Sequence, residues 1–93
     1  MEFTKEKHDT LLDWLSMNLI KTQTINYNID TATIRKAFMH RISIYVDNMA
    51  VNSVMFELGY HAANFSHDPY LSFNVSSQSP ALQIYRTEVL GPH

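Results

Sequence analysis

Residues 47–60, DNMAVNSVMFELGY, decide the fold because they hold the clearest helix start and the clearest helix stop in the chain. Asp47 is a favoured N-cap residue, and Gly59 suits the left-handed conformation that follows the end of a helix. Between them, apolar residues recur at every fourth position, at Ala50, Val54 and Leu58. This spacing places them on one face of a helix, which we predict at about residues 48–58.

The same kind of spacing predicts two more helices upstream. One covers about residues 5–21 behind Thr4, and the other covers about residues 31–41 behind Asp30 or Thr31. Their apolar stripes are Leu11, Leu12, Leu15 and Leu19 in the first helix and Ile34, Ala37 and Phe38 in the second. A chain of 93 residues has room for one core, so residues 1–93 are expected to form a single domain.

Four other segments alternate apolar or β-branched residues with polar ones, which is typical of strands. They are predicted as strands at about residues 23–28, 60–65, 70–75 and 81–86. Polar turn residues at 66–69 separate the second segment from the third. The expected fold class is therefore α+β, with three helices, a short strand after the first helix, and a C-terminal β-hairpin or small antiparallel sheet.

This order of elements resembles a winged-helix domain, in which two helices form a helix-turn-helix and the closing hairpin forms the wing. Residues 47–60 look like the last helix of such domains, running through a Leu-Gly-aromatic exit into the wing. Small phage and plasmid replication or regulatory proteins often carry this arrangement. The resemblance covers about residues 5–86 and is one of pattern, so it implies a nucleic-acid-binding regulatory or replication accessory protein only as an expectation.

The charges of the chain are unevenly distributed. The formal net charge is −2, whereas a non-specific nucleic-acid binder is usually basic. Positive charge is concentrated in residues 31–46, which contain Arg35, Lys36 and Arg41 and no acidic residue. Any contact with a phosphate backbone would therefore depend on this local patch.

The nucleic-acid hypothesis assigns roles to residues of two predicted helices. The cluster of Arg35, Lys36, Arg41 and His40 would contact the phosphate backbone of the nucleic acid. The alternative is that these residues are ordinary solvated surface charges. Asn48 and Asn52 would face the bases, because an Asn side chain can form two hydrogen bonds with the major-groove edge of adenine. The alternative for these two residues is an ordinary polar face on a packed helix.

A second hypothesis is a protein-interaction module, or a small inhibitor of a nucleic-acid-processing enzyme. It rests on the negative net charge and on Tyr60, Tyr70 and Tyr85, whose rings suit a polar-aromatic interface. Under either hypothesis the chain could form a homodimer. Both hypotheses describe a binding protein and not an enzyme.

Other classes of function find little support in the sequence. There is no cysteine, and only two glycines occur, so neither a thiolate metal site nor a Gly-rich phosphate loop is expected. We expect no catalytic residue, metal or cofactor, and a small ribonuclease or toxin using His40 or His61 is the third and weakest hypothesis. No apolar run is long enough to span a membrane, and a cytoplasmic location is expected.

Overall fold

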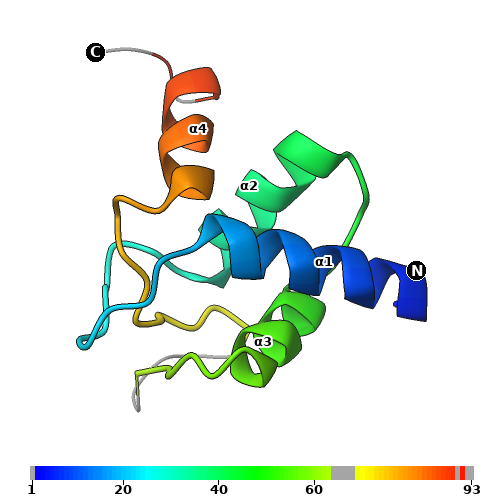
Figure 1. Cartoon of the computed structure of the whole chain (residues 1–93), viewed down its shortest axis with the longest axis horizontal. Coiled ribbons are helices and arrows are strands. Elements are labelled where there is room, and N and C mark those ends of the chain that lie inside the picture. Colours follow the sequence, from blue (N-terminus) through cyan, green and yellow to red (C-terminus); the bar gives the residue numbers. More distant parts are fainter. Residues whose placement is uncertain (1, 64–68, 90, 92–93) are drawn as a thin grey trace.

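The computed structural model describes residues 2–63, 69–89 and 91, and this part of the chain forms four helices (Figure 1). They are α1 (Lys5–Asn18), α2 (Thr31–Ile42), α3 (Asn48–Glu57) and α4 (Pro80–Glu88). Helices α1 and α2 contact each other in the centre. Helix α3 contacts both of them at one end, and α4 contacts both at the other, so α3 and α4 do not meet.

The first three helices form close to their predicted bounds because their N-caps are local features of the sequence. The side chains of Thr4, Asp30 and Asp47 accept hydrogen bonds from the backbone N–H groups of Lys7, Thr33 and Ala50, at 3.2, 3.0 and 2.8 Å. Gly59 follows α3 with a φ of +88°, in the left-handed region expected for it. Caps therefore fix where these helices begin, and Gly59 marks the end of α3.

The predicted α+β fold is wrong, since the described residues contain no strand, sheet or hairpin. The clearest error is residues 81–86, predicted as a strand, which lie inside α4. Pro80 occupies the first turn of α4, where its missing N–H has no helical partner to lose. Ala81 and Leu82 are buried where α4 packs on α2 and α1. Without a closing hairpin, the winged-helix arrangement does not hold for this part of the chain.

Irregular extended segments take the place of the predicted sheet. Isolated antiparallel bridges join Lys21 to Val75, Asp30 to Ser72 and Ala62 to Phe73. The segment 71–76 therefore lies between residues 20–31 on one side and residues 61–63 on the other. Of the remaining predicted strands, residues 23–28 form bends and a turn, and residues 64–68, at the end of strand 60–65 and in the turn, lie outside the described residues.

The side chain of Asn74 adds to the backbone hydrogen bonds between these segments. Its Nδ2 donates to the carbonyl oxygen of Thr22 at 2.9 Å, and its Oδ1 accepts from the backbone N–H of His61 at 2.7 Å. Asn74 is 4% exposed, so both bonds are shielded from water. A buried amide thus satisfies backbone groups on both neighbouring segments.

The core lies where the helices meet these extended segments. Its fully buried members are Leu11, Leu15, Ile34, Phe38, Val51, Val54, Met55, Phe73 and Val75. Trp14 covers one edge of it, with its ring 5.5 Å from that of Phe38 in an edge-to-face contact. Among the described residues, no helix has both the length and the apolar character needed to cross a membrane.

Candidate interaction surface

Helix α3 carries apolar side chains on its outer face as well as on its inner face. Met49 and Phe56 are 60% and 51% exposed, and the exposed Ser53 lies between them along the helix. Spacings of four and seven residues place all three on one side of a helix. We call this surface the α3 face, defined as Met49, Ser53 and Phe56.

The opposite side of α3 is packed into the core. Its buried apolar residues are Ala50, Val51, Val54 and Met55. The ring of Phe56 also lies 5.6 Å from that of Phe73 in an edge contact, so the α3 face is continuous with the core at this end. A helix with apolar residues on all sides is usually buried on all sides. Helix α3 has apolar residues on its outer side too, but this chain buries only its inner side.

Acidic residues flank the α3 face, and one of them, Glu57, is paired with the imidazole of His8 at 2.7 Å. Asp47 caps the start of α3, Glu57 is its last residue, and the helix contains no Lys or Arg. Both acidic residues are exposed. The apolar strip is therefore bounded by a carboxylate at each end.

Asn52, which was predicted to face the bases, is buried at 4% exposure inside the fold. Its Oδ1 accepts a 2.6 Å hydrogen bond from the Thr31 hydroxyl, and its Nδ2 donates to the carbonyl oxygen of Pro69 at 2.9 Å. These bonds connect α3 to the start of α2 and to the segment before residue 71. The amide is therefore used in packing and is not presented to a ligand.

Asn48 occupies the first position of α3 and is half-buried. Among the described residues its Oδ1 is the buried side-chain oxygen without a hydrogen-bond partner. An acceptor that faces inward in this way does not lie beside the α3 face, so Asn48 and Asn52 do not form a common reading surface.

The cations of α2 have different surroundings. Arg35 donates from Nε to the carbonyl oxygen of Val46 at 2.6 Å, and its guanidinium lies 5.2 Å from the ring centre of Tyr45. Arg41 lies 3.6 Å from Glu88. Lys36 is exposed.

His40 also contacts Glu88, with Nε2 2.8 Å from Oε1. Glu88 is the last residue of α4 and is 48 residues from His40 in the sequence, so no local motif signals this pairing. The carboxylate offsets part of the positive charge that the sequence concentrates in residues 31–46.

The three tyrosines predicted at an interface have different surroundings. Tyr60 is 6% exposed, and the Lys21 ammonium lies 5.0 Å from its ring centre. Burial raises the pKa of the Tyr60 hydroxyl above its ordinary value of 10.0. Tyr85 is half-buried, with its ring 6.3 Å from the His40 ring, whereas Tyr70 is 53% exposed. Of the three, Tyr70 alone presents most of its ring to solvent.

One group that the sequence did not single out is His8. Its Nε2 lies 2.7 Å from Glu57 and its Nδ1 lies 3.0 Å from Asp9. Hydrogen bonds to Glu57 and then to Asp9 raise the pKa of His8 above its ordinary value of 6.5. No local motif signals this contact, because Glu57 is 49 residues away in the sequence.

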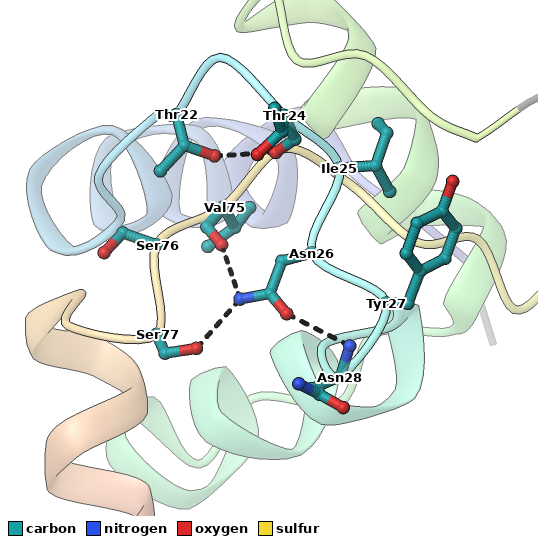
Figure 2. Close-up of a pocket in the computed structure, with 9 residues that line it drawn as sticks. All are labelled: Thr22, Thr24, Ile25, Asn26, Tyr27, Asn28, Val75, Ser76 and Ser77. Carbon is teal, nitrogen blue, oxygen red and sulfur yellow. Dashed lines mark hydrogen bonds between the residues drawn. The ribbon is translucent and has the colours of Figure 1, made fainter.

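A hollow of about 420 Å³ lies between residues 22–28 and residues 75–77 (Figure 2). The Asn26 amide projects into it. Its Nδ2 donates to the Val75 carbonyl and the Ser77 hydroxyl at 3.0 and 2.8 Å, and its Oδ1 accepts from the Asn28 N–H at 3.0 Å. These bonds hold residues 22–28 against residues 75–77. The Asn26 amide, the central polar group of the hollow, therefore already has hydrogen-bond partners within the chain.

The described residues hold no group of three or more His, Asp or Glu side chains placed to bind a metal ion. The α3 face combines two exposed apolar side chains on one side of a helix with an exposed carboxylate at each end. No protein-family model, curated protein or solved structure matches this chain.

Proposed function

We propose that this chain is a protein-interaction module that binds its partner through the α3 face. The observation that carries the proposal is the exposure of Met49 and Phe56, 60% and 51%, on the outer side of a helix whose inner side is fully packed. Exposed apolar side chains aligned on one helix face mark binding surfaces more often than scattered ones do. Aromatic residues and Met are also enriched at the centres of protein interfaces.

The acidic boundary of the α3 face defines the chemistry of the partner. Asp47 and Glu57 lie at opposite ends of α3, and no cation lies on the helix between them. The Asp47 carboxylate complements a surface with an apolar centre and a Lys or Arg side chain beside it, whereas Glu57 is already paired with His8 at 2.7 Å. Two copies of α3 packed antiparallel would bring Asp47 of one near Glu57 of the other, so a basic protein is a better partner than a second copy.

Nucleic-acid binding, the first expectation from the sequence, draws less support from the geometry. Arg35 is held by a backbone carbonyl and Arg41 is close to Glu88. Asn52 is buried, and the α3 face offers no cation to a phosphate. A polyanion would also be repelled by Asp47 and Glu57. Nucleic-acid binding, like the cytoplasmic location, stays a prediction.

The proposal is tested with immobilised wild-type chain and three variants in a pull-down from the source cell. Ser53→Glu places a charge in the centre of the α3 face without touching the core, and Met49→Ser removes an exposed apolar side chain. The matched control is Met17→Ser, since Met17 is 79% exposed on α1. We expect a basic protein to be retained by the wild type and the control, less by Met49→Ser, and least by Ser53→Glu.

Two parallel measurements separate the rival functions. Titration of labelled duplex and single-stranded DNA at low salt compares the wild type with Arg35→Glu/Lys36→Glu. DNA binding that the double variant abolishes would replace the proposal with the nucleic-acid hypothesis. Sedimentation of the purified chain then tests the homodimer, and a dimer dissociated by Ser53→Glu would identify the partner as a second copy.

A further inference from the structure

The imidazole of His8 lies between two carboxylates that come from two different helices. Its Nε2 is 2.7 Å from Oε2 of Glu57, the last residue of α3. Its Nδ1 is 3.0 Å from Oδ1 of Asp9, the next residue on α1. Both ring nitrogens are therefore at hydrogen-bonding distance from an oxygen that, when ionised, can only accept.

This geometry fits the doubly protonated ring. A neutral imidazole has one N–H donor, and its other nitrogen presents a lone pair. A neutral His8 can therefore satisfy Glu57 or Asp9 but not both, whereas the imidazolium donates to both at once. The hydrogen bonds to the two carboxylates favour the charged form, which agrees with the raised pKa of His8.

We propose that His8 is a pH-sensitive clasp between α1 and α3, closed when its ring carries both protons and loosened when it loses one. Loss of a proton turns a nitrogen lone pair toward a carboxylate, so one of the two contacts is lost. When Nδ1 keeps the remaining proton, the released contact is the one to Glu57. In that state the first turns of α1 are no longer tied to the end of α3.

Two carboxylates act on the ring, Glu57 from α3 and Asp9 from α1 itself. Helices α2 and α4 also pack against α1, but within the described residues neither contributes a charge that acts on His8. The nearby Lys7 ammonium is directed to the carbonyl oxygen of Glu2 at 3.3 Å. The clasp therefore depends on one imidazole and two acids, and it does not depend on the proposed function of the α3 face.

The first test follows the His8 ring resonances by NMR across the range from about pH 5 to about pH 9. The variants are Glu57→Gln and Asp9→Asn. Asp13→Asn is the matched control, because Asp13 is an exposed α1 carboxylate that does not act on His8. We expect a titration midpoint above 6.5 in the wild type and the control, and a lower midpoint in Glu57→Gln and in Asp9→Asn, with the larger decrease in Glu57→Gln. A midpoint unchanged by Glu57→Gln would overturn the proposal.

The second test measures the clasp itself. Because the chain has no cysteine, Lys5→Cys gives a single site for a spin label, which broadens each amide signal according to its distance from the start of α1. We expect the broadening at residues 56–58 to be stronger about one pH unit below the titration midpoint found in the first test than about one pH unit above it, and to lose this pH dependence when Glu57→Gln is added. Equal broadening at both pH values in the wild-type background would overturn the proposal, even if the titration midpoint is raised.

Discussion

The Thr31 hydroxyl, at the start of α2, donates a 2.6 Å hydrogen bond to Oδ1 of Asn52 in the middle of α3. The same hydroxyl oxygen accepts the backbone N–H of Leu71 at 2.9 Å. Thr31 is fully buried and Asn52 nearly so. Two helices and an extended segment are thus joined by one polar pair that is shielded from water. Removing the side chain of either residue leaves a buried polar group without this hydrogen bond.

Replacing Asn52 with Ala should therefore destabilise the fold by about 2–4 kcal/mol, from the unpaired Thr31 hydroxyl, the unpaired Pro69 carbonyl and the space left behind. Urea denaturation followed by circular dichroism measures the change. The exposed Ser53→Ala, one residue along the helix, serves as the control and should change stability by less than about 0.5 kcal/mol. If both variants unfold at the same urea concentration, the buried role of Asn52 is wrong.

Gly59 should not tolerate a side chain. Its φ of +88° is strained for an L-residue, and an added Cβ would lie 3.1 Å from the Lys21 Nζ, which donates to the Leu58 carbonyl at 3.0 Å. We expect Gly59→Ala to lower the free energy of unfolding by about 1–2 kcal/mol. Gly91→Ala is an informative comparison, because Gly91 has a φ of +82° with open space around it. A loss from Gly59→Ala no larger than that from Gly91→Ala would show that the contact with Lys21 is unimportant.

The helical state of residues 80–88 can be tested by the sign of a single surface substitution. Thr87 is exposed on α4, so Thr87→Ala should stabilise the fold by up to about 0.5 kcal/mol, because Ala has the higher helix propensity. The predicted strand ended at about residue 86; if it continued through Thr87, the same change would be destabilising, because Thr favours strands. Thermal unfolding of the two proteins at one pH distinguishes these outcomes.

The starts of the first three helices were predictable from the sequence, whereas the pairing of the extended segments was not. Thr4, Asp30 and Asp47 each cap a helix within three residues, so their signals are local. The alternation of Leu71, Phe73 and Val75 also indicated correctly that these three side chains are buried, but it placed Asn74, which is buried too, on the exposed side. Its indication of a sheet was wrong, because pairing depends on segments as distant as residues 22 and 74, which meet through a backbone hydrogen bond and the Asn74 amide without forming a ladder.

The candidate site was only partly predictable for a related reason. The stripe of Ala50, Val54 and Leu58 located the inner side of α3, but the buried side extends further and includes Asn52. A polar residue is usually assigned to the outside, and its buried partners Thr31 and Pro69 come from other parts of the chain. Met49, in contrast, is apolar and exposed, which no rule of periodicity signals.

Alkaline pH should unfold the wild type more readily than Tyr60→Phe. Burial raises the folded-state pKa of Tyr60 above the 10.0 expected for the unfolded chain. Below about pH 10 the Tyr60 hydroxyl is neutral in both states, and its contribution to the free energy of unfolding is complete. As the pH rises toward the raised pKa of the folded state, the unfolded state ionises first. The contribution is therefore lost over this range. Phe keeps the ring beside Lys21 but cannot ionise, so it removes this loss while leaving the packing nearly unchanged. The measurement is the urea midpoint at about pH 8 and about pH 11, with the exposed Tyr70→Phe as the control, and an equal decrease in all three proteins would contradict the assignment.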